Sequence, residues 1–235
     1  MYEFAELVYA NVVGEGDFDD DTFSDLFEGP DKAARPYKDT LLHDVIRNVV
    51  GFCLDYSTGH TADIEVDYYR SILAEAGLSA PYWLQPEHVE RHIRALDRLL
   101  GQAVAVIAPT VFYVLFSDRQ FLIAFQGRVA AYIGALKRED HPEILVRDGV
   151  LKRPKHLPVW LKAGVFYRDR GRCQNCSKDL SGLSRPVRDL NLDHIIPLAA
   201  AGSNDPSNFQ LLCTHCNSAK GTKKFNEPPK FAPYW

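Results

Sequence analysis

Four cysteines in two closely spaced pairs are the residues of this chain best suited to bind a metal. Cys173 and Cys176 form one C-x2-C pair, and Cys213 and Cys216 form a second. Four thiolates can close a tetrahedron around one Zn²⁺, and four sulfurs leave no position open for a substrate. No basic region precedes an apolar stretch at the amino terminus, so we expect a cytoplasmic protein whose thiols stay reduced. The pairs therefore predict one structural zinc ion per chain rather than disulfides.

Polar side chains that could bind a metal or accept a proton lie between and just after the two pairs. Asp193 and His194 end a short apolar run, Asn208 begins a second one, and Asn217 directly follows the last cysteine. Together with the cysteines, this pattern resembles the HNH endonuclease family, in the form whose ββα-metal core is braced by four cysteines. The resemblance covers residues 157–224. The third motif position is Asn217 rather than histidine, a variant that keeps a side-chain oxygen for a metal.

The resemblance implies hydrolysis of DNA phosphodiester bonds with the help of Mg²⁺ or Mn²⁺. Hard divalent cations bind oxygen, which Asp193 and Asn217 would supply. His194 would take the proton from the attacking water, and Asn208 would orient the His194 ring by a hydrogen bond. Neighbouring residues of a regular strand point to opposite faces. We therefore expect the strand to bend at Asp193-His194.

The charges of the chain are unevenly distributed. Residues 150–235 contain 14 of the 27 Lys and Arg but 6 of the 31 Asp and Glu, a net charge of +8, which leaves −12 on residues 1–149. A basic carboxy-terminal part fits a polyanionic substrate such as DNA. The candidate DNA contacts flank the cysteine motif on both sides: Lys162, Arg168, Arg170, Lys220, Lys223 and Lys224.

The same asymmetry, together with a segment of three prolines at 141–158, predicts two domains. Residues 1–150 form a helical domain whose role is recognition, regulation or oligomerisation, and residues 151–235 form the nuclease domain. The expected fold class is α+β, mostly α, with a small zinc-braced ββα-metal domain after the helical one. Apolar residues at helical spacing predict helices at 2–13, 21–27, 39–57, 63–75, 87–101 and 120–136.

Residues 99–117 carry no charge, which raises the question of a membrane span. Glycine, glutamine and proline inside this segment favour a buried core helix that is broken near Pro109. We therefore expect no membrane association.

Two functions of different class fit the sequence. One is an active DNA endonuclease, and the other is an inactive zinc-braced module that binds nucleic acid or serves as a scaffold. An inactive module has no reason to keep Asp193, His194, Asn208 and Asn217 together, so we favour catalysis. A helical domain joined to such a nuclease resembles bacterial restriction or phage-defence proteins, which suggests a protein partner or self-association through that domain.

Overall fold

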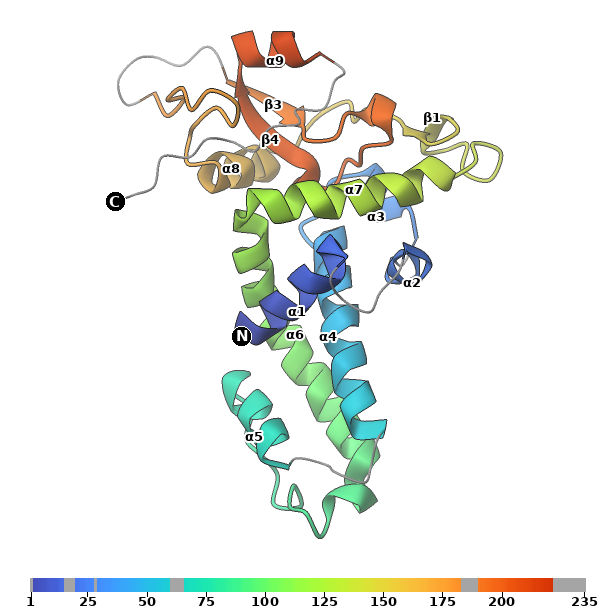
Figure 1. Cartoon of the computed structure of the whole chain (residues 1–235), viewed down its shortest axis with the longest axis vertical. Helices are drawn as coiled ribbons and strands as arrows, with labels where there is room; N and C mark the ends of the chain where they lie inside the picture. The colour runs from blue at the N-terminus through green and yellow to red at the C-terminus, as the bar shows by residue number, and fades with distance from the viewer. Residues whose placement is uncertain (1, 15–19, 28, 60–65, 183–189, 222–235) are drawn as a thin grey trace. The chain divides into compact units, whose positions relative to one another are not determined.

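The computed structural model describes residues 2–14, 20–27, 29–59, 66–182 and 190–221 (Figure 1). The chain is mostly helical and forms two compact units. The helical unit contains Met1–Asp17 and Leu42–Leu115, and the motif unit contains Phe18–Leu41 and Phe116–Trp235. The chain thus begins in the helical unit, passes through the motif unit, returns to the helical unit and ends in the motif unit. This division lies elsewhere than the predicted domain boundary near residue 150, because residues 31–41 and 119–152 bond to the motif region.

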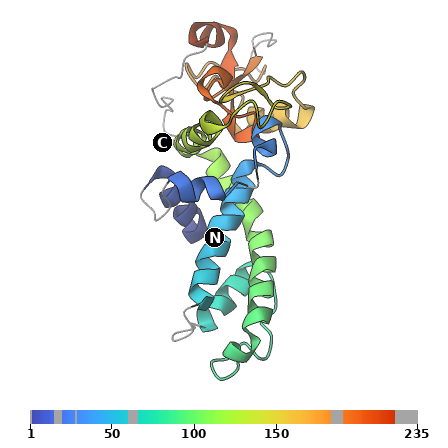
Figure 2. The ribbon, with the colours of Figure 1, turned by 90° about the vertical axis from the view of Figure 1, so that its right-hand side faces the viewer.

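The helical unit is built from helices with one buried apolar face. Its elements are α1 (Tyr2–Val13), α4 (Leu41–Gly59), α5 (Val66–Glu75), the 3-10 turn η2 (Val89–His92) and α6 (Ile93–Ser117). Figures 1 and 2 show α4 and α6 side by side, and the rings of His43 and Phe112 stack between them with centroids 3.9 Å apart. Helix α5 is followed by Gly77, whose φ of +68° suits glycine.

Helix α6 runs unbroken through Pro109, so the predicted break at this residue is wrong. Proline removes one backbone donor, but the buried apolar residues on both sides of it hold the helix to its unit: Leu100, Val104, Ile107, Val111 and Leu115. The helix ends at Ser117 instead. There Asp118 accepts a hydrogen bond from the Phe121 backbone N–H at 3.0 Å and caps the next helix.

The segment Val89–Ser117 is the one described helix whose length and composition would allow it to cross a membrane. About 50% of its most apolar window is buried inside the protein.

The motif unit combines short strands with helices. In chain order it contains α2 (Asp20–Asp25), α3 (Asp31–Ala34), α7 (Arg119–Ala135), β1 (Leu145–Arg147), β2 (Val150–Leu151), α8 (Val159–Arg168), β3 (Leu190–His194), η3 (Leu198–Ala200), η4 (Pro206–Asn208), β4 (Phe209–Cys213) and α9 (Thr214–Lys220). Strands β1 and β2 pair with each other, and β3 pairs with β4, both antiparallel. Figure 1 shows the β3–β4 pair beside α8 and α9.

Strand β4 is buried along its whole length and forms the centre of the motif unit. Its Phe209 packs with Leu161 and Val165 of α8. Its Leu211 and Leu212 pack with Leu180 and with three cysteines, Cys173, Cys213 and Cys216. The pairing with β3 sets Asp193 opposite Gln210 and His194 opposite Phe209. The hydrophobic burial of β4 therefore fixes where both motif residues of β3 lie.

Candidate metal centre and active site

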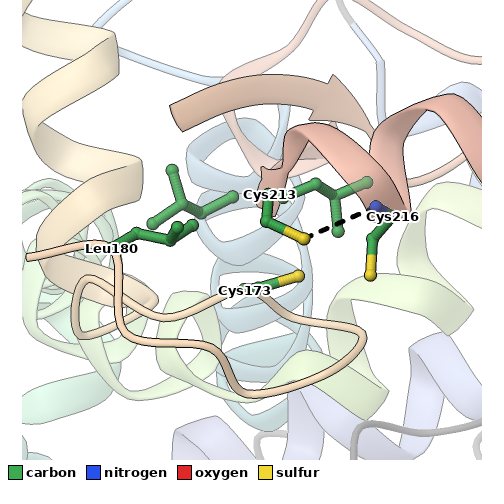
Figure 3. Close-up of a cluster of buried hydrophobic side chains, with 6 residues drawn as sticks. Cys173, Leu180, Cys213 and Cys216 are labelled. Carbon is green, nitrogen blue, oxygen red and sulfur yellow. Dashed lines mark hydrogen bonds between the residues drawn. The ribbon is translucent and has the colours of Figure 1, made fainter. Parts of the chain in front are cut away.

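The four motif cysteines converge on one point. Figure 3 shows three of them, Cys173, Cys213 and Cys216. Their Sγ atoms all lie within 4.8 Å of one another, and those of Cys176 and Cys213 are 3.8 Å apart. Tetrahedral zinc with Zn–S bonds of about 2.3 Å separates its sulfurs by about 3.8 Å. A disulfide would need about 2.05 Å. The described residues thus fit a four-thiolate metal site, consistent with structural zinc.

Two of the sulfurs accept hydrogen bonds from neighbouring N–H groups. The Sγ atom of Cys213 accepts a hydrogen bond from the Cys216 backbone N–H at 3.4 Å, and Cys216 accepts one from the Asn175 side chain at 3.2 Å. Burial opposes ionisation of the Cys173 thiol, but backbone hydrogen bonds outweigh it and lower its pKa to about 7. Burial raises the pKa of Cys216 to about 12. Metal binding at this site must therefore displace a proton, at least from Cys216.

His194 is the buried member of the motif. Its ring lies against the Phe209 ring, with centroids 4.5 Å apart, and its Nε2 lies 3.0 Å from Oδ1 of Asn204. Burial lowers the pKa of His194 to about 4, although the bond to Asn204 and the charge of Asp193 act in the opposite direction. The imidazole is therefore neutral at pH 7, and the same burial makes it a weaker base than a histidine in water.

Asp193 lies on the opposite face of β3 and is only partly buried. Its Oδ2 accepts hydrogen bonds from Gln210 Nε2 at 3.1 Å and from the Lys220 ammonium of α9. The side chain of Asp193 is 18% exposed, whereas that of Lys220 is 1% exposed. The pairing of β3 with β4 continues regularly to His194, so the bend predicted at Asp193-His194 is not present. The side chains of Asp193 and His194 point to opposite faces of β3 because successive side chains of a regular strand alternate.

Asn208 closes the loop between the strands. Its side chain accepts a hydrogen bond from the Ile196 backbone N–H at 2.9 Å and donates to the carbonyls of Ile196 at 3.0 Å and Ser203 at 2.7 Å. All three of these bonds go to the backbone, so the expected bond from Asn208 to the His194 ring is absent and Asn204 takes its place.

The loop that Asn208 closes is tight. A Cβ atom added at Gly202 would lie 1.8 Å from the Ile196 carbonyl oxygen, so no side chain fits there.

The predicted DNA contacts fall into three groups. Lys162 and Arg170 are exposed, as a phosphate contact requires. Arg168 is buried between the Phe116 ring, the Phe209 carbonyl and Asp169, and Lys220 is buried against Asp193. These two side chains therefore stabilise the fold instead of facing DNA. The remaining two predicted contacts, Lys223 and Lys224, lie outside the described residues.

Sequence reasoning missed the residues that hold the loop 203–210 from outside. Gln126 of α7 donates to the Ser207 hydroxyl at 2.7 Å and accepts from the Ser203 hydroxyl at 2.8 Å. Arg119, also of α7, donates to Gln210. The small, polar residues at 203–208 are typical of a loop, and the structure buries the side chains from Ser203 to Asn208. No local signal reveals this, because the partners lie about 80 residues away in sequence.

Comparison with known proteins identifies the class of this region. Residues 173–223 match the family model of the HNH endonuclease. This match confirms the resemblance inferred from the cysteine pairs and the residues between them. No curated protein and no solved structure matches the chain. The carboxy-terminal region is thus an HNH domain with a four-cysteine metal site, which suggests a nuclease-type function and a nucleic acid as substrate.

Proposed function

We propose that the chain is a divalent-metal-dependent endonuclease that hydrolyses phosphodiester bonds of DNA. The observation that carries this proposal is the placement of His194 and a partly exposed carboxylate, Asp193, at neighbouring positions of β3 inside the region that matches the HNH family. A neutral imidazole at this position can take the proton of a water molecule that attacks the phosphorus atom.

The oxygen atoms at the site fit a hard cation such as Mg²⁺ or Mn²⁺. Asp193 uses Oδ2 for Gln210 and Lys220, and its Oδ1 accepts no hydrogen bond from the described part of the chain. Asn217 is half-buried on α9, which packs against β3, and its amide bonds to none of the described side chains. Asp193 and Asn217 would hold the ion. When bound, the ion supplies positive charge that stabilises the transition state of phosphodiester hydrolysis.

One observation favours the second candidate, an inactive zinc-braced module that binds nucleic acid or serves as a scaffold. The Lys220 ammonium already neutralises Asp193, which weakens the attraction of this carboxylate for a divalent cation. Such a module would bind DNA without cutting it, whatever cation is supplied.

Incubation of the zinc-loaded protein with supercoiled plasmid separates the two candidates. The endonuclease converts the plasmid to nicked or linear DNA with Mg²⁺ or Mn²⁺ and leaves it intact with a slight excess of EDTA. If the protein slows the migration of the plasmid in a gel-shift experiment but does not cleave it with either cation, the chain is the inactive module.

We further propose a role in bacterial restriction or phage defence, in which the helical unit recognises a trigger or a partner. The combination of a helical unit with an HNH domain supports this role by analogy. Phage should then form fewer plaques on bacteria that express the chain than on bacteria that express the His194→Ala variant. Equal plating for a panel of phages would refute the role and leave the chemistry unaffected.

A further inference from the structure

Asn204 is a fully buried residue at which three segments of the motif unit meet. Its backbone N–H donates to the Ala33 carbonyl at 2.7 Å. Its side-chain Nδ2 donates to the carbonyls of Ala34 at 3.0 Å and Lys152 at 2.9 Å. Its Oδ1 lies 3.0 Å from Nε2 of His194. Every hydrogen-bonding group of this amide side chain is therefore used, and the HNH loop is joined by it to α3 and to the end of β2.

The two carbonyls determine which way the amide points. Carbonyl oxygens only accept hydrogen bonds, so the amide nitrogen must face Ala34 and Lys152, and the amide oxygen must face His194. An amide oxygen also only accepts. The ring of His194 must therefore donate from Nε2, and in the neutral ring Nδ1 then carries the lone pair.

We propose that Asn204 is the positioning residue of His194, and that the Ala34 and Lys152 carbonyls hold it in the orientation that leaves Nδ1 as the proton-accepting nitrogen. The catalytic part of this inference rests on the proposed endonuclease function. The choice of tautomer rests on the hydrogen bonds alone and can be tested separately.

Residues before and after the long segment Leu42–Leu115 of the helical unit thereby become part of the active site. Asp205, the next residue, accepts a hydrogen bond from the Leu41 backbone N–H at 2.8 Å, where α4 begins. The segment from Ala33 to Leu41 thus contacts two neighbouring residues of this loop, Asn204 and Asp205. If this segment moved away from the loop, the Asn204 amide would lose its hydrogen bond to Ala34, and the His194 ring would no longer be held in one orientation.

The tautomer of His194 is measurable in the full-length, zinc-loaded protein without any variant. Long-range ¹H–¹⁵N spectra of histidine-labelled protein at pH 7.5 distinguish protonated from unprotonated ring nitrogens, and the His194→Ala spectrum identifies the signals. We expect a protonated Nε2 and an unprotonated Nδ1. A proton on Nδ1, or exchange between the two tautomers, would overturn the proposal.

Two asparagine variants test the consequence for catalysis. Asn204→Ala should lower kcat about 10- to 100-fold, with the KM for DNA and the zinc content unchanged. Its His194 ring should also lose the single tautomer, which a merely structural residue would not cause. Asn191→Ala is the control, since Asn191 lies on β3, the strand that carries His194, and bonds only to Thr214 among the described side chains. Its kcat and spectrum should equal those of the wild type.

The outcomes separate the two levels of inference. A wild-type protein that cuts DNA but carries the Nδ1 proton refutes the role of Asn204 and leaves the endonuclease intact. A protein with the expected tautomer and no cleavage refutes the endonuclease and leaves the hydrogen-bond assignment intact. If Asn204→Ala does not fold, the wild-type spectrum still decides the tautomer.

Discussion

Replacement of Lys220 by methionine tests whether this lysine stabilises the fold or contacts DNA. Its ammonium donates to the Asp193 carboxylate and to the His194 carbonyl, and its side chain is 1% exposed. Methionine keeps the apolar stem in place and removes the charge. Breaking a buried ion pair from one side costs about 3–5 kcal/mol. Because Asp193 is 18% exposed, water can partly solvate the carboxylate that remains, and we expect a loss of about 2–3 kcal/mol.

Thermal unfolding of the zinc-loaded protein measures this loss. For a chain of this length, 1 kcal/mol shifts Tm by about 2–4 °C, so Lys220→Met should lower Tm by about 4–12 °C. Lys162→Met is the matched control, because Lys162 is exposed on α8, and it should change stability by less than about 0.5 kcal/mol. The reasoning fails if Lys220→Met keeps the wild-type Tm while the salt dependence of DNA binding decreases by about 0.9 in log–log slope, as the loss of one phosphate contact requires.

Three further predictions concern the metal, the histidine and the segments outside the HNH match. Cys213→Ser should abolish the binding of one zinc per chain and unfold the motif unit, as seen by elemental analysis and near-ultraviolet circular dichroism; zinc retained at full stoichiometry would contradict the site. The pKa of His194 is lowered to about 4, so the unfolded chain takes up this proton first as the pH falls below 6.5. Stability should therefore decrease by about 3 kcal/mol between pH 6.5 and 4 on account of this residue, and urea unfolding of His194→Gln should lack that part of the decrease. A fragment of residues 154–235 should not fold, because it lacks the Ala33, Ala34 and Leu41 partners of the buried Asn204 and Asp205; a cooperative unfolding transition of the zinc-loaded fragment would show that these contacts are dispensable.

Local patterns in the sequence predicted the metal site and several helices well. The spacing of the four cysteines suffices for the metal site, since each C-x2-C pair is a local unit. Helix α1 occupies the predicted residues 2–13, because its apolar positions repeat at helical spacing. The residues that match the HNH family also lie within one continuous stretch.

Long-range contacts were beyond prediction. Asn204 bonds to residues 52 and 170 positions earlier in the chain, and no periodicity records such a contact. Lys220 was predicted as a DNA contact because a lysine often follows this motif in the family that the sequence resembles, and only the fold reveals the carboxylate that pairs with it. Pro109 was expected to break α6, but packing on both sides of it outweighs one missing hydrogen bond.

Cleavage of supercoiled plasmid by matched histidine variants tests the endonuclease most directly. The wild type, His194→Ala and His88→Ala are compared with Mg²⁺ after zinc content and Tm have been shown to agree. His88 is exposed in the helical unit, so its variant controls for the loss of a histidine. We predict cleavage by the wild type and His88→Ala, and a loss of at least about 100-fold in His194→Ala. Cleavage by His194→Ala at the wild-type rate would contradict the assignment of His194 as the base.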